Sequence, residues 1–127
     1  MITKEAISKA QEQFGGRNFP LLVKAFLDLG MVTNTVDIKD GKAIYNDKDG
    51  HRVTMPAFKV EAVADTLNKE YFMQQLKLHQ ASQTDFPTFC KDTADAGIYK
   101  WDVDLLAKTC TYFDLNDQMV YSEPIPV

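Results

Sequence analysis

Residues 31–47 read MVTNTVDIKDGKAIYND, and this stretch decides the fold. Val32 and Val36 alternate with polar residues, which is the two-residue period of a half-buried strand. Asp40-Gly41 is a signal for a two-residue hairpin turn, and Asp49-Gly50 is a second one. The stretch and its continuation therefore predict a three-stranded antiparallel meander.

Two helices are predicted before this meander. Thr3 can cap a helix of about 11 residues that stops at Gly15-Gly16. A second helix begins at Pro20, since proline at the first helical position loses no hydrogen bond, and it ends at Gly30. The second half predicts the same order, with helices near 68–81 and 85–96 and strands near 98–104, 109–114 and 118–123.

The two halves also resemble each other in sequence. Shifting the chain by 67 residues places 19–53 on 86–120 without a gap and gives ten identities in 35 positions, where unrelated sequence would give about two. The identical pairs include Lys24 with Lys91, Gly30 with Gly97 and Tyr45 with Tyr112. We interpret this as an internal duplication with repeats at approximately 3–57 and 68–124. The alternative is chance, reinforced by shared helix-stop and turn residues.

The predicted fold is α+β: one domain, 1–127, of two pseudo-symmetric ααβββ repeats whose antiparallel meanders pack against helices. If Val36 faces Tyr45 across the first turn, then Val103 faces Tyr112 in the second repeat. The helix-covered face would carry Tyr99, Trp101, Val103, Cys110, Tyr112, Met119 and Tyr121, and the solvent face Lys100, Asp102, Thr109, Thr111 and Ser122. The sequence leaves open whether the meanders join into one six-stranded sheet or pack separately.

Composition excludes several classes of function. The 127 residues carry 14 basic and 18 acidic side chains, and the only arginines are Arg17 and Arg52. Nucleic acid and anionic membranes both require a clustered cationic surface, so neither is an expected partner. No apolar run approaches the roughly 18 residues of a membrane span, and residues 1–5 resemble no signal peptide. We expect a cytoplasmic protein with two reduced thiols.

Cys90 and His79 form the first candidate constellation. A histidine on the preceding helix could hold Cys90 as a nucleophilic thiolate. The alternative is structural, because Cys90 shares a helical stripe with Phe86 and Phe89 and would then be a buried thiol. Cys110 raises a disulfide with Cys90 as a further option, although free thiols suit a reducing compartment better.

Metal and acid chemistry have weaker sequence support. Cys90, Cys110, His79 and His51 come singly from separate elements, without the clustered spacing of a zinc site. Asp102 and Asp104 point the same way along one strand, as paired acids would, but we favour a solvated face, which Lys100 and Lys108 can neutralise. We predict no metal and no cofactor, since phosphate-loop and nucleophile-elbow motifs are absent from the sequence.

The aromatic group of the second repeat gives the leading functional hypothesis. Tyr99, Trp101 and Tyr112, with His79 at their edge, could line a ligand pocket or an interface, or form a wall of the core. Val32, Asn34 and Tyr45 occupy the matching positions, so the second copy is the more aromatic.

Most of the sequence resembles a known family, and the resemblance is densest from about residue 79 onward. The residues His79-Gln80, Phe86-Pro87-Thr88-Phe89-Cys90, Ala94-Asp95-Ala96-Gly97, Trp101, Thr109-Cys110-Thr111-Tyr112 and Ile125-Pro126 look like the YbcV-like family of small bacterial proteins, also labelled phage envelope protein-like. The resemblance implies a small bacterial or prophage-derived protein without an assigned activity, and it brings no catalytic or binding residues.

Three functions remain open from the sequence. The first is a non-enzymatic domain that binds an unknown small molecule or protein. The second is a cysteine-dependent enzyme or redox protein that uses Cys90 with His79. The third is a structural, prophage-derived assembly protein. A homodimer is plausible in each case, through an open strand edge near 118–123.

Overall fold

The computed structural model describes residues 2–14, 19–81 and 83–125. The first half contains two helices and three strands: α1 (Lys4–Phe14), α2 (Phe19–Asp28), β1 (Met31–Asp37), β2 (Lys42–Asp47) and β3 (Arg52–Pro56). The second half repeats this order with α3 (Lys69–Gln80), α4 (Phe86–Asp95), β4 (Ile98–Asp104), β5 (Thr109–Asp114) and β6 (Met119–Pro124). The predicted α+β class and the order of elements are therefore confirmed.

The helix starts follow from local capping. The Thr3 hydroxyl accepts a hydrogen bond from the Ala6 N–H at 3.2 Å, as predicted for α1. Asp85 caps α4 by accepting from the Thr88 N–H at 2.8 Å. The predicted stop at Gly15-Gly16 lies outside the described residues. Among the described helices, none is both long enough and apolar enough to cross a membrane.

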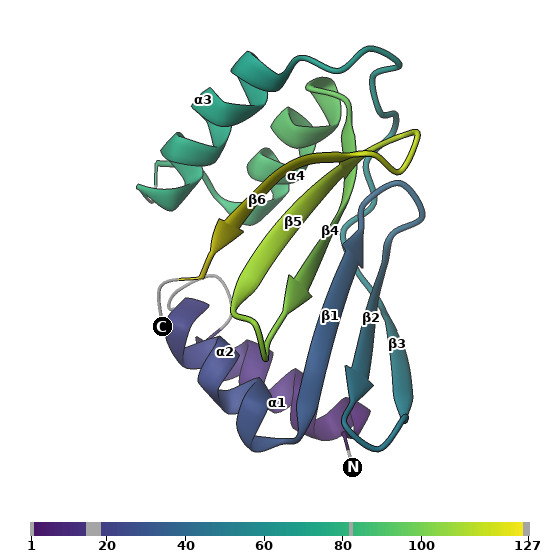
Figure 1. The fold of residues 1–127 in the computed structure, drawn as a ribbon, viewed down its shortest axis with the longest axis vertical. Coiled ribbons are helices and arrows are strands. Elements are labelled where there is room, and N and C mark those ends of the chain that lie inside the picture. The colour runs from purple at the N-terminus through teal and green to yellow at the C-terminus, as the bar shows by residue number, and fades with distance from the viewer. Residues whose placement is uncertain (1, 15–18, 82, 126–127) are drawn as a thin grey trace.

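All six strands join into one antiparallel sheet, which answers the question that the sequence left open. The strand order is β3-β2-β1-β4-β5-β6, so the two meanders meet where β1 pairs with β4. The helix pairs pack on one face: Phe26 of α2 contacts Tyr45 at a ring distance of 5.8 Å, and Phe72 of α3 contacts Tyr112 at 4.9 Å. Figure 1 shows α1 and α2 toward one end of the sheet, and α3 and α4 toward the other.

The 67-residue offset also relates the geometry of the two halves. Thr35 pairs across the β1–β4 boundary with Asp102, the residue 67 positions later. Two hydrogen bonds at this boundary exchange under the same offset: the Ile38 N–H donates to the Tyr99 carbonyl, and the Leu105 N–H to the Val32 carbonyl. The halves are thus related by an approximate twofold axis beside Thr35, and residues 67 apart are called equivalent below. The internal duplication itself stays a prediction.

Equivalent aspartates build equivalent turns. The Asp37 carboxylate accepts from the N–H groups of Lys39 and Asp40, and Asp104 accepts from two N–H groups in the same way. This capped connection spans residues 38–41, so the predicted two-residue turn at Asp40-Gly41 is wrong. Strand register moves with it: Tyr45 pairs with Asn34 and Tyr112 with Trp101, two residues from the predicted partners. A two-residue shift keeps each side chain on its predicted face.

Two side chains lie on the face opposite to the predicted one, because of strand irregularities. Between Ile98 and Lys100 the β4–β5 register shifts, and the Tyr99 ring lies beside the Lys100 ammonium, 5.5 Å from it. A second shift in the β5–β6 pairing places Met119 opposite Phe113, with 65% of Met119 exposed. An extra residue in one strand reverses the alternation beyond it, which a simple two-residue period cannot predict.

Candidate functional site

Trp101 belongs to a packed aromatic core. Its ring lies 5.7 Å from Phe89, 6.3 Å from Phe86 and 6.0 Å from Tyr112, and only 6% of the residue is exposed. Edge-on and tilted contacts at these distances are typical of aromatic cores. The helix pair α3–α4 therefore covers the side chain on which the predicted ligand pocket depended.

His79 and Tyr112 reach this core, whereas Tyr99 does not. The His79 ring stacks on Phe89 at 4.2 Å, and its Nδ1 lies 3.3 Å from the Thr84 hydroxyl. Burial lowers the pKa of His79 below 6.5, so the ring is neutral at pH 7. Tyr99 instead donates a hydrogen bond to Asp117 on the other face of the sheet.

Both thiols are core groups. Cys90 is fully buried, and burial raises its pKa to about 12. Cys110 is also buried and free, and desolvation raises its pKa to about 12. A thiol in this environment stays protonated at neutral pH, and the thiolate is the nucleophilic form. The predicted base, His79, stacks on the residue next to Cys90 in the chain.

Acidic side chains of the second half accept hydrogen bonds within the fold. Asp102 accepts a hydrogen bond from the Thr35 hydroxyl at 2.7 Å, next to the twofold axis. Glu123 accepts from the Gln80 amide at 2.9 Å and from the Tyr112 hydroxyl at 3.3 Å. Asp104 caps a turn by accepting hydrogen bonds from the N–H groups of Leu106 and Ala107.

The turn between β2 and β3 brings Asp47, Asp49 and His51 together. One ligand atom from each lies within 4.8 Å of the others, a spacing that could hold a cation. However, the Asp47 carboxylate already accepts hydrogen bonds from the N–H groups of Ile2, Asp49 and His51. Its pKa is lowered to about 2, because these bonds outweigh desolvation. The cluster is accounted for as a turn.

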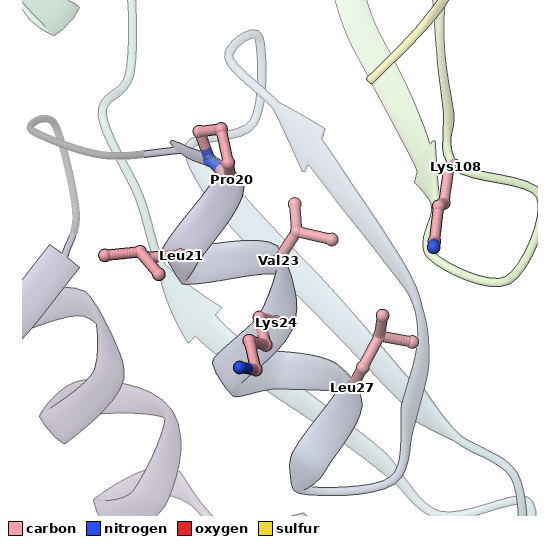
Figure 2. A pocket seen from close by; sticks show the side chains of 6 residues that line it. All are labelled: Pro20, Leu21, Val23, Lys24, Leu27 and Lys108. Carbon is pink, nitrogen blue, oxygen red and sulfur yellow. The ribbon is translucent and has the colours of Figure 1, made fainter. Parts of the chain in front are cut away.

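A concave apolar surface lies along α2, outside the core. It has a volume of about 310 Å³ and is lined by Pro20, Leu21, Val23, Lys24, Leu27 and Lys108. Figure 2 shows Val23 and Leu27 projecting from α2 on the side of Lys108, which comes from the turn between β4 and β5. The two lysines place positive charge beside an apolar floor. This surface is called the α2 groove below.

The corresponding surface of α4 is different. A hollow of about 530 Å³ is lined there by Lys91, Ala94 and Asp95 of the helix and by residues 58–62 of the chain that connects β3 to α3. The sequence predictions did not include either surface. The one signal in the sequence was the identity of Lys24 and Lys91, which line the two surfaces. This identity does not show that the connecting chain lies on α4 alone.

Fold and site together define the class of the molecule: an α+β protein of two ααβββ units on one antiparallel sheet, with buried thiols and an open apolar groove on α2. A family model described as a protein of unknown function, DUF1398, matches residues 4–124, and the chain belongs to this family. It is also similar to uncharacterized proteins of Mycobacterium bovis and Mycobacterium tuberculosis, with 30% identity over 102 residues in each comparison. The matched region is 79% of this chain and 62% of each relative, so the chain spans less than two thirds of their length.

Proposed function

We propose that this chain is a non-enzymatic protein-interaction domain and that the α2 groove is its binding surface. The observation that carries the proposal is an apolar floor, made by Pro20, Val23 and Leu27, in a groove that the side chains of Lys24 and Lys108 also line. Apolar concave surfaces with a few polar groups at the border are typical of binding sites. The groove thus suits an apolar partner that carries negative charge.

The other candidate functions have less structural support. A cysteine-dependent mechanism needs an accessible thiolate, whereas Cys90 is buried and its pKa is about 12. A small-molecule site at Trp101 needs open space beside a ring that the helices cover. The sequence resemblance to the YbcV-like, phage envelope protein-like family supports a third proposal, a prophage-derived assembly protein in the bacterial cytoplasm. That proposal predicts stable oligomers in solution.

An apolar anion provides a direct test of the α2 groove. The probe 1-anilinonaphthalene-8-sulfonate combines aromatic rings with a sulfonate, so it should bind the folded protein with a saturable rise in fluorescence. Leu27→Asp should weaken this binding at least tenfold, because it places a carboxylate in the apolar floor. Leu78→Asp is the matched control, since Leu78 is 43% exposed on α3. Equal binding by both variants, or no saturable binding to the unmodified chain, would contradict the proposal.

A further inference from the structure

The connecting chain at residues 57–68, called the linker below, shows how an equivalent surface is covered. It runs from β3 to α3 and is drawn in teal between them in Figure 1. Its Ala64 and Asn68 N–H groups donate to the Ala94 and Ala96 carbonyls at the end of α4, at 2.9 and 2.8 Å. Val60 donates to the Ile38 carbonyl at 2.9 Å and is itself buried. The linker thus donates hydrogen bonds to carbonyls at a helix end while it buries an apolar side chain.

Within residues 2–14, 19–81 and 83–125, no segment covers the equivalent surface at the end of α2 in this way. Leu27 and Leu29 are equivalent to Ala94 and Ala96, but they remain partly exposed, whereas the two alanines are buried. The glycines that follow give the same contrast. A Cβ added at Gly97 would lie 2.9 Å from Leu67 of the linker, whereas a Cβ at Gly30 would meet its nearest neighbour, Lys48, at 3.8 Å. The linker therefore fills a space at α4 that no described residue fills at α2.

The start of the equivalent path is also present. In the first half, the Ala57 N–H donates to the Gly41 carbonyl at 2.9 Å as the chain leaves β3. In the second half, the Ile125 N–H donates to the Lys108 carbonyl at 2.7 Å. Ile125 takes the position of Ala57 because the irregular β5–β6 pairing adds one residue. Because Lys108 also lines the α2 groove, the covered path and the open groove occupy equivalent places in the two halves.

Charge indicates the chemistry of an occupant. On α4, Lys91 lines the hollow together with Glu61 of the linker. Its equivalent, Lys24, lines the α2 groove, where Lys108 adds a second cation. A segment that replaces the linker at α2 should therefore carry a carboxylate beside its apolar side chain, as Val60-Glu61 does. The linker contains neither helix nor strand over residues 57–68, so a segment that binds in the same mode should also be non-helical.

We propose that the α2 groove binds a non-helical segment of a partner polypeptide, with an apolar side chain next to a carboxylate, in the mode in which the linker covers α4. This inference rests on the proposed function and specifies its partner. The Leu27 carbonyl is the expected acceptor for a partner N–H, because its equivalent, the Ala94 carbonyl, accepts from both Gly97 and Ala64.

The test uses the full chain and a synthetic peptide with the sequence of residues 57–68. In methyl and amide NMR spectra, the peptide should cause saturable shifts at Val23, Leu27 and Leu29, and none at Ala94, where the chain's own linker is bound. A peptide with the Val60→Asp change should bind at least tenfold more weakly. A peptide with the Glu61→Lys change should bind more weakly as well, and this loss should shrink at high salt.

A second measurement detects peptide binding that is too weak to observe with the free peptide. The same peptide joined to the C-terminus through a short Gly-Ser linker is present at an effective concentration of about millimolar. If neither form shifts Leu27 and Leu29, the inference of a non-helical occupant is overturned. The proposed function itself would be overturned by a different result, namely that the sulfonate probe does not bind saturably or binds both variants equally. The two failures are therefore distinguishable. Shifts that persist in the Leu27→Asp variant would also overturn the inference, because they would place the peptide elsewhere.

Discussion

Alkylation of Cys90 tests the assignment of this thiol to the core. The chain with Cys110→Ser isolates Cys90, which is fully buried and has a pKa of about 12 against the ordinary 9.0. A rise of about three units leaves roughly 1,000-fold less thiolate at pH 7.5 than an exposed cysteine has. Contact with a reagent also requires local opening, so native labelling should be more than about 1,000-fold slower than labelling of the unfolded chain.

The assay follows iodoacetamide adducts by mass spectrometry from pH 6 to pH 9, with urea-unfolded protein as the reference. His79→Ala is the control for a catalytic pair. It should leave the apparent pKa of Cys90 unchanged, even if a looser helix speeds labelling at every pH. Native labelling within about tenfold of the unfolded rate, with an apparent pKa below about 7.5 that moves in the histidine variant, would refute the reasoning.

Three further predictions concern the free energy of unfolding, each measured by urea unfolding at 25 °C. Gly30→Ala should lower it by about 1–2 kcal/mol because the φ of Gly30 is +89°. Gly97→Ala should lower it further, because the added Cβ would also contact the linker at 2.9 Å, and equal losses would contradict the difference between the two helix ends. Trp101→Ala should cost about 3–5 kcal/mol as a core residue, and a loss under about 1 kcal/mol would place Trp101 at an open site. Burial lowers the pKa of His79, so the unfolded chain takes up the proton first and stability should fall as the pH drops below 6.5; His79→Gln should flatten this dependence, and an unchanged slope would contradict it.

The regular parts of the fold could be predicted from the sequence because they depend on local signals. Helix caps at Thr3 and Asp85, glycine stops and the two-residue strand period each act within a few residues. The 67-residue offset placed the predicted helices and strands of the second half at positions equivalent to those of the first. Class, element order and most boundaries follow from these signals.

The errors arose where one residue changes the local geometry. Asp37 converts an expected two-residue turn into a four-residue connection by capping it with its carboxylate. Irregular strand pairing sends Tyr99 and Met119 to the face opposite to the predicted one. Such irregularities depend on side-chain contacts that a periodic pattern does not contain.

The candidate site could be predicted only in part. His79 and Tyr112 do reach the Trp101 core through ring contacts, but that core is packed rather than hollow. The α2 groove depends on a comparison between two helix ends, and the linker that distinguishes them has no equivalent among the aligned residues. Its path is a tertiary feature, which local propensity does not encode.

The most direct test of the central claim measures solvent access at the two equivalent surfaces. A soluble gadolinium chelate broadens methyl NMR signals in proportion to their exposure, and Leu27, Leu29 and Val60 all carry methyl groups. An open α2 groove predicts strong broadening at Leu27 and Leu29, and weak broadening at Val60, the buried linker side chain, which is 6% exposed. Protection of Leu27 and Leu29 equal to that of Val60, in dilute monomeric protein, would contradict the account.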